Sequence, residues 1–201
     1  MASSPTRPRL RARYERRRDG VARAAAAVFA QRGYDQTSVQ ELTQAMGLAA
    51  GGLYHYFESK EQLLIHICDQ LVEPLLVRAN ELLARVEQPE QQLRELVHLW
   101  VAHVVEHRDH MLVFDQERHV VERGINWRRV RSSRKQFERL LEQTLARVEQ
   151  TRAEPGWDRR VALSALLGMV NYTAQWYRAR GRLAPEQIAD GYVELILGQP
   201  G

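Results

Sequence analysis

The segment from residue 37 to residue 64 constrains the fold more than any other part of the chain. Residues 37–46 combine hydroxyl side chains that can cap a helix with apolar side chains at helical spacing. Gly47 ends that helix, and residues 50–57 are predicted to form a second short helix. Two short helices joined by a tight glycine turn form a helix-turn-helix, whose second helix can enter the major groove of DNA.

Apolar side chains at helical spacing predict a small core for this segment. Each short helix presents one apolar face, and both faces can pack against a longer helix expected over residues 10–32. Thr37 and Ser38 are each followed three residues later by a glutamine or a glutamate, which is capping-box spacing. The residues expected in the core are Phe29, Val39, Leu42, Met46, Leu53 and Phe57.

The remainder of the chain is predicted to be helical too. No stretch shows sustained period-two alternation with β-branched residues, so we expect an all-α protein of about nine helices. Pro74 is expected to kink or break a helix that begins near Ser59. We place a domain boundary close to residue 62, which gives an N-terminal domain (1–62) and a C-terminal domain (63–201). Further helices are expected near residues 75–87, 90–107, 110–123, 126–153, 158–180 and 185–198.

Positive charge is concentrated in the N-terminal part of the chain. Residues 1–62 contain ten Arg and Lys against six Asp and Glu, whereas the rest of the chain contains nineteen of each. Seven of the arginines lie between residues 7 and 18, an arm that could also be a solvated, partly disordered tail. A basic surface beside the second short helix suits phosphate neutralisation. We therefore expect Arg16, Arg17 and Arg18 to contact phosphates or a minor groove.

Composition disfavours several other classes of protein. No run of about 18 apolar residues is present, so we expect no membrane span, and Asp19 and Arg23 interrupt the stretch that most resembles a signal peptide. The sole cysteine, Cys68, permits no internal disulfide, which suits the cytoplasm, and its helical register predicts a buried thiol. No phosphate loop, nucleophile elbow or HExxH motif is present, so we do not expect an enzyme.

His103 and His107, four residues apart on one helical face, have a spacing that suits zinc or nickel. His110 and His119 follow at a greater distance along the chain. No cysteine or clear carboxylate partner accompanies the pair. We therefore expect a polar pocket wall or a solvated face at this position, and neither a metal nor a cofactor.

Four runs of residues in the N-terminal part resemble a known DNA-binding domain. They are AAAVFAQRGY at 25–34, TSV at 37–39, MGL at 46–48 and LYHYFESKE at 53–61, in unbroken order. Together they closely resemble the DNA-binding domain of TetR-family transcriptional regulators. The resemblance implies an all-helical homodimer that binds a near-palindromic DNA operator. It also implies a small-molecule pocket in the C-terminal domain and, usually, repression that the bound molecule relieves.

The same resemblance implies roles for individual residues. The family often has serine or threonine where this chain has Ala49, and alanine cannot cap the second helix. With two glycines as well, that helix has few side chains that can read bases, which favours phosphate contacts and DNA shape. The residues expected at phosphates are Thr37, Ser38, Tyr54 and Lys60, and those expected at the bases are Gly51, Gly52 and His55.

The two helices nearest the C-terminus carry broad apolar faces. They could close the core of a single subunit, or they could pair with their copies in a second subunit as a four-helix interface. The family resemblance and the need for paired half-sites favour the dimer interface. The residues on these faces are Leu166, Met169, Val170, Thr173, Trp176, Tyr177, Ile188, Tyr192, Leu195 and Ile196.

The C-terminal half resembles one branch of the family in particular. Residues 167–178, with GRL at 181–183 and QIAD at 187–190, look like the branch that responds to acyl-coenzyme A thioesters, although a common proline after residue 178 is Ala179 here. Sensing of drugs or other hydrophobic molecules is the alternative, and a helical interaction protein that does not bind DNA is a further one. We expect a mostly apolar pocket, lined by Trp100, Phe114, Arg118, Asn171 and Gln175.

Overall fold

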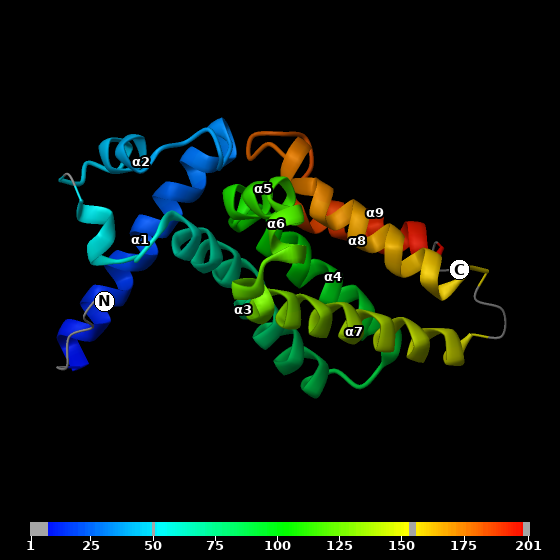
Figure 1. The fold of residues 1–201 in the computed structure, drawn as a ribbon. Helices are drawn as coiled ribbons and strands as arrows, with labels where there is room; N and C mark the ends of the chain where they lie inside the picture. Colours follow the sequence, from blue (N-terminus) through cyan, green and yellow to red (C-terminus); the bar gives the residue numbers. More distant parts are fainter. Residues whose placement is uncertain (1–7, 50, 153–155, 199–201) are drawn as a thin grey trace. The chain divides into compact units, whose positions relative to one another are not determined.

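The structure is a computed structural model that describes residues 8–49, 51–152 and 156–198. Over these residues the regular structure is entirely helical, with nine α-helices, two short 3₁₀ helices and no strand (Figure 1). The expected all-α fold is therefore confirmed. The α-helices are α1 (Pro8–Arg32), α2 (Val39–Ala45), α3 (Lys60–Arg85), α4 (Pro89–Glu106), α5 (Arg108–Gln116), α6 (Arg118–Arg123), α7 (Arg128–Thr151), α8 (Arg159–Trp176) and α9 (Pro185–Leu197), and the 3₁₀ helices are η1 (Gly52–His55) and η2 (Ile125–Trp127).

The chain divides into two compact units. The first contains the chain up to Leu71 together with Asp109–Val130, and the second contains Val72–Arg108 together with the chain from Arg131 on. In the second unit, α4 packs against both α8 and α9. The predicted boundary near residue 62, between an N-terminal and a C-terminal domain, stays a prediction.

The core of the first unit is built around α1. Small side chains on its inner face, among them Ala22, Ala25 and Ala26, are fully buried and let neighbouring elements approach the helix closely. Val39 and Met46 are half-buried. The other four residues expected in this core are at most 1% exposed: Phe29, Leu42, Leu53 and Phe57.

Pro74 does not break its helix, which corrects the prediction of separate helices before and after it. Helix α3 continues through Pro74 to Arg85. Pro74 lies on the exposed side of the helix, whereas Leu71 and Leu75 are buried. The proline removes one backbone hydrogen bond on that exposed side. Buried apolar residues before and after it keep the helix continuous, because packing supplies most of the stability of a helix in a protein.

The second short helix, predicted over residues 50–57, is reduced to the single 3₁₀ turn of η1. The residue before it, Gly51, has φ of 78°, in the left-handed region that a right-handed helix cannot include. Gly52 then begins a four-residue 3₁₀ helix, in which the Tyr54 N–H donates to the Gly51 carbonyl and the Tyr56 N–H to the Leu53 carbonyl, each three residues back. The predicted second short helix is therefore present, as a 3₁₀ helix that is shorter than predicted.

Two other predicted helices differ in where they end. The helix predicted over 110–123 divides into α5 and α6, because the backbone at Glu117 (φ −97°, ψ 16°) leaves helical geometry. The helix predicted over 158–180 ends as α8 at Trp176, because Tyr177 is extended (φ −58°, ψ 139°). Both differences arise at single residues whose backbone conformation the apolar pattern does not report.

Cys68 lies fully buried in the first unit, and burial raises the pKa of its thiol, as expected of a core cysteine. Along the residues that the structure describes, none of the helices combines the length and the apolar character that crossing a membrane requires. Arg7, Ala50 and the predicted helix end at residue 153 lie outside the described residues.

Candidate nucleic-acid interface

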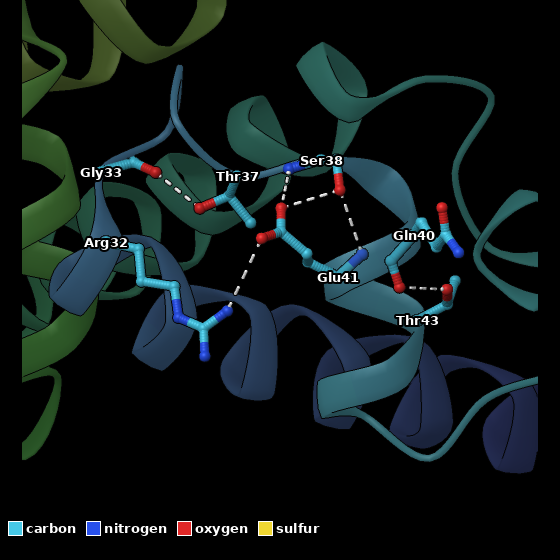
Figure 2. A network of polar contacts seen from close by, with 7 residues as sticks. All are labelled: Arg32, Gly33, Thr37, Ser38, Gln40, Glu41 and Thr43. Atoms are coloured by element: carbon cyan, nitrogen blue, oxygen red, sulfur yellow. Dashed lines mark hydrogen bonds and ion pairs between the residues drawn. The ribbon is translucent and has the colours of Figure 1, made fainter.

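A capping box closes the start of α2. The Ser38 Oγ accepts a hydrogen bond from the Glu41 backbone N–H at 3.2 Å (Figure 2). The Glu41 carboxylate in turn accepts bonds from the backbone N–H and the hydroxyl of Ser38, both at 2.7 Å. These bonds from Ser38 hold the pKa of Glu41 below its usual value. Ser38 is exposed, but both of its donors are already used, so a phosphate at Ser38 would compete with Glu41.

Thr37 has a different environment from its neighbour. Its side chain is 1% exposed, and its hydroxyl donates to the Gly33 carbonyl at 2.7 Å (Figure 2). Gly33 has φ of 84°, the conformation in which glycine commonly ends a helix. Thr37 therefore shapes the turn between α1 and α2, and its buried side chain offers little surface to a phosphate.

The reading element, which we define as Gly51–Phe57, presents few side chains to a partner. Leu53 and Phe57 are buried in the core of the unit. Tyr54 is 52% exposed and His55 is also exposed, which leaves them as the side chains of η1 most available to DNA. A Cβ added to Gly52 would lie 3.2 Å from the Leu48 Cβ, so this glycine permits a close approach of the turn to η1.

Helix α1 contacts the C-terminal end of the reading element. The Tyr14 hydroxyl donates to the His55 carbonyl at 2.9 Å, and the Tyr14 and Tyr56 rings lie 5.5 Å apart. One turn later, the Arg18 guanidinium lies 5.0 Å from the centre of the Phe57 ring. The basic segment from Pro8 on is therefore part of a helix that packs beside η1.

The three arginines predicted to contact DNA do not share one environment. Arg16 and Arg17 are exposed on α1. Arg18 is half-buried over Phe57 and forms a 3.8 Å ion pair with Glu15. Arg16 and Arg17 therefore remain open to phosphate, whereas part of Arg18 packs against the protein.

Lys60, at the start of α3, is held by aromatic rings. Its Nζ lies 4.1 Å from the centre of the Tyr34 ring and 6.0 Å from that of Phe29. Burial raises the pKa of Tyr34, with Glu61 and Asp35 adding to the effect. Lys60 is half-buried, so its ammonium group has a defined position at the edge of the unit.

Helices α8 and α9 of the second unit each have a buried face and an exposed face. The buried or inner face packs against α4, and we call the exposed face the outer face. The Thr173 Oγ1 lies 2.9 Å from the Tyr192 hydroxyl, which joins the two helices. A groove of about 480 Å³ runs over the outer face, with Trp176, Leu183 and Leu195 among its lining residues. Of the residues predicted at the dimer interface, the buried ones are Leu166, Val170, Thr173 and Ile188, the half-buried ones Met169, Tyr177, Tyr192 and Ile196, and the exposed ones Trp176 and Leu195.

The outer face contains two large residues that the sequence analysis missed. Val161 is 65% exposed and Tyr172 is 63% exposed, and both lie on α8. Extending the helical register back from Trp176 by four and then eleven residues would have found them. The exposed apolar surface of α8 is therefore longer than the predicted face.

The five residues predicted to line a ligand pocket are distributed over both units. Trp100 is buried in the second unit, where its ring meets Phe137 edge-on at 4.9 Å, and Asn171 and Gln175 are half-buried on α8. In the first unit, Phe114 is buried and Arg118 is exposed. The Arg118 side chain forms an ion pair at 3.1 Å with a glutamate one turn later on α6. The five residues therefore belong to two different units, and a shared pocket stays a prediction.

His103 and His107 do lie near a carboxylate, which the sequence analysis did not find. Their possible ligand atoms and those of Glu106 all lie within 4.8 Å of one another. The two imidazole rings stack, however, with centres 4.2 Å apart and 27° between their planes. Nearly parallel rings do not direct their in-plane lone pairs to a common point, so this arrangement differs from that of a formed metal site.

Sequence comparison gives matches over both parts of the chain. Residues 22–67 match the family described as bacterial regulatory proteins, tetR family, and residues 86–199 match one described as tetracyclin repressor-like, C-terminal domain. The chain belongs to the TetR family. It is thus a helix-turn-helix transcriptional regulator, as the resemblance implied.

Individual TetR-family relatives match over most of this chain. The regulator PfmR from Thermus thermophilus is 31% identical, over 88% of this chain and 96% of its own, with a TM-score of 0.78. The HTH-type transcriptional repressor KstR2 of Mycolicibacterium smegmatis is 26% identical, over 90% of this chain and 89% of its own. AibR, whose structure was determined in complex with isovaleryl coenzyme A and operator DNA, is 27% identical in sequence. The match covers 90% of this chain and 98% of the AibR chain, with a TM-score of 0.76. All three are named as transcriptional regulators or determined with operator DNA, and none is named as an enzyme.

In this TetR-family chain, the missing N-cap at Ala49 has a local consequence. Ala49 is exposed, and its carbonyl accepts a hydrogen bond from the Gly52 N–H at 2.8 Å. Gly51 precedes η1 and supplies no side-chain cap. The reading element therefore has no cap of its own, and contacts from elsewhere must hold it in place.

Two residues that hold α1 against the rest of the first unit were not predicted from the sequence. One is Tyr14, which bonds to the reading element. The other is His66 on α3, whose Nε2 lies 3.1 Å from Asp19 Oδ1. Apolar periodicity does not report such contacts, because each joins polar atoms more than 40 residues apart in sequence.

Proposed function

We propose that this TetR-family protein is a homodimeric repressor of a near-palindromic operator, released by an acyl-coenzyme A thioester. In this proposal residues 1–62 form the DNA-binding domain and residues 63–201 the ligand-binding and dimerisation domain. The observation that carries the DNA-binding part is the exposed edge of the first unit. There Tyr54 and His55 of η1 project beside the basic surface of α1.

Charge and backbone exposure favour this edge as the DNA contact. Exposed Arg16 and Arg17 suit phosphates, and the half-buried Lys60 adds a cation of defined position. Gly51 and Gly52 let the backbone approach base edges, and His55 is the best placed polar side chain for direct readout. With so few readers, sequence preference would depend in part on DNA shape.

The outer face of α8 and α9 supports a dimer. Val161, Tyr172, Trp176 and Leu195 are all large apolar residues with 41% or more of their surface exposed. Exposed apolar patches of this kind are typical of protein interfaces, and aromatic side chains are enriched in them. A second copy of the same helix pair would cover the patch as a four-helix bundle, and would give the two-fold symmetry that paired half-sites need.

The choice of effector rests on relatives. AibR was determined with isovaleryl coenzyme A, and a Mycobacterium tuberculosis relative carries the name ketosteroid transcriptional regulator KstR2. In this chain, Trp100, Asn171 and Gln175 would line an apolar pocket with a few polar groups. In the first unit, the exposed Arg118 has a guanidinium group of the kind that binds phosphates. A sensor of drugs or other hydrophobic molecules is the alternative.

A two-step experiment tests the proposal. Duplexes that the protein prefers are first selected from a random-sequence library, and the best is labelled for fluorescence anisotropy. Isovaleryl-coenzyme A, palmitoyl-coenzyme A, free coenzyme A and a hydrophobic dye such as rhodamine 6G are then added separately. We expect release by at least one thioester and not by free coenzyme A.

The possible failures are distinguishable. Recovery of no preferred sequence would favour a helical interaction protein that binds acidic partners without reading DNA. A preferred sequence that only the dye releases would favour the drug-sensing alternative. No release at saturating levels of both thioesters would rule out their acyl classes as effectors.

A further inference from the structure

Helix α1 has a row of side chains directed at the reading element and at the helix that follows it. Tyr14 bonds to the His55 carbonyl at 2.9 Å and packs against the Tyr56 ring, with 5.5 Å between the ring centres. Four residues later, Arg18 lies over the ring of Phe57. Tyr14 and Arg18 share a helical face because they are four residues apart.

The next residue of α1 extends the row to α3. Asp19 Oδ1 lies 3.1 Å from the His66 Nε2, and the His66 ring lies 5.2 Å from that of Phe57. We call Tyr14, Arg18 and Asp19 the α1 contact row. Its three members reach the end of the reading element and the first turns of α3.

The reading element needs such support because it is intrinsically weak. It contains one 3₁₀ turn, begins with two glycines and has no side-chain cap. Glycine costs roughly 1 kcal/mol of helix stability relative to alanine, and 3₁₀ hydrogen bonds have poorer geometry than α-helical ones. Leu53 and Phe57 fix its buried side. On its exposed side, the bond to the His55 carbonyl comes from Tyr14.

We propose that Tyr14 is a positioning residue for operator recognition. Its hydroxyl holds the His55 carbonyl and its ring packs on the Tyr56 ring, so that the exposed His55 side chain is presented to the bases at one position. This inference rests on the proposed DNA-binding function. A direct contact between Tyr14 and DNA is not part of it.

The proposal predicts a loss of sequence discrimination with little loss of general DNA binding. Tyr14→Phe removes the hydroxyl and keeps the ring, while Tyr14→Ala removes both. Affinity is measured for the selected duplex and for a scrambled duplex of equal length and composition. We expect Tyr14→Phe to lower the affinity ratio of the two duplexes roughly two- to tenfold, the range expected for one hydrogen bond. Tyr14→Ala should lower it further.

Two readouts separate positioning from a purely structural role. The slope of log affinity against log salt should stay at the wild-type value, because no cation is removed. In the second readout, Tyr14→Phe should add little to the effect of His55→Ala on the affinity ratio when both are combined, because it acts through His55. Gln31→Ala, an exposed change near the other end of α1, serves as the control and should leave the ratio unchanged.

The outcomes that overturn the proposal are specific. An unchanged affinity ratio in folded Tyr14→Phe and Tyr14→Ala would show that Tyr14 does not position His55. Equal losses for both duplexes, or full additivity with His55→Ala, would do the same. If the wild-type protein prefers no duplex, the proposed DNA-reading function itself fails, and that result is seen before any variant is made.

Discussion

Two neighbouring hydroxyls, those of Thr37 and Ser38, act at the ends of two different helices. Thr37 donates back to the Gly33 carbonyl at the end of α1, and Ser38 caps the start of α2. Although the two residues are adjacent, Thr37 is buried and Ser38 is exposed. At the scale of single residues, the helix-turn-helix depends on these two bonds as well as on its apolar core.

Removing the Ser38 cap should destabilise the first unit. Ser38→Ala loses the acceptor for the Glu41 N–H and the hydroxyl donor to its carboxylate. We expect the free energy of unfolding to fall by about 1 kcal/mol, measured by urea denaturation followed by circular dichroism. Ser164→Ala, an exposed serine within α8, is the control and should change stability by less. Equal effects of the two substitutions would contradict a capping role.

His66 should make the first unit sensitive to mild acid. Burial lowers the pKa of His66, with Arg18 adding to the effect, and the bond to Asp19 opposes it only in part. The unfolded chain therefore binds more protons at this site as the pH falls below about 6.5, and the folded state loses stability there. Unfolding free energies at pH 7.5 and 5.5 should differ more for the wild type than for His66→Gln. The same pH dependence in both proteins would show that His66 is not responsible.

At the scale of elements, α1 combines two functions on two faces. Its inner face carries alanines and Phe29 into the core, and its first half carries exposed arginines beside the reading element. A helix holds these charges at defined positions, whereas a disordered arm would lose conformational entropy on binding. The contacts of Tyr14 and Arg18 explain why this basic segment is helical at a place where the sequence also allows a tail.

The arginines of α1 should separate into two classes by experiment. Replacing Arg16 and Arg17 together by Ala removes two exposed cations, so the slope of log affinity against log salt should decrease in magnitude by up to about 2. Arg18→Ala should instead reduce thermal stability, because its side chain packs on Phe57. Anisotropy titrations between about 50 and 200 mM salt, the range over which counterion release changes affinity strongly, measure the slope. Melting curves measure the stability. An unchanged slope for the double variant would remove this face of α1 from the DNA interface.

Substitutions at Gly51 test whether DNA binding by the reading element depends on its backbone conformation. At φ of 78° it occupies the left-handed region, where alanine is strained by roughly 1 kcal/mol and asparagine less so. We therefore expect Gly51→Ala to lower operator affinity more than Gly51→Asn, although alanine is the smaller change. A Cβ at this position would meet no atom within 4 Å, so steric overlap within the protein does not confuse the comparison. The opposite order of affinities would argue that side-chain size at the DNA, and not backbone strain, governs Gly51.

At the scale of the whole molecule, the proposed dimer joins DNA binding to effector binding. Two copies of the reading element can address two half-sites only if the subunits associate. The second unit offers α8 and α9 for this purpose, with an inner face already used for packing against α4. The outer face is therefore the part of the helix pair left for a partner.

A charge on the outer face should dissociate the dimer. Leu195 is 73% exposed on α9, and Leu195→Glu would bury an unpaired carboxylate in the proposed interface. We expect sedimentation velocity to show a shift toward monomer and operator affinity to fall with it. Ile125→Glu is the matched control, because Ile125 is 79% exposed but lies in η2, outside the proposed interface. A Leu195→Glu protein that remains dimeric would place the interface elsewhere.

The sequence by itself determined the all-α fold, the position of the helix-turn-helix and its core residues Phe29, Leu42, Leu53 and Phe57. These follow from helical periodicity and from capping and glycine signals, which act between residues close together in the chain. Only the tertiary structure decided that Pro74 lies within one helix and that Thr37 is buried. It likewise assigned Tyr14 to the reading element, because these outcomes depend on packing between distant segments, which can outweigh local preferences and which local patterns do not encode.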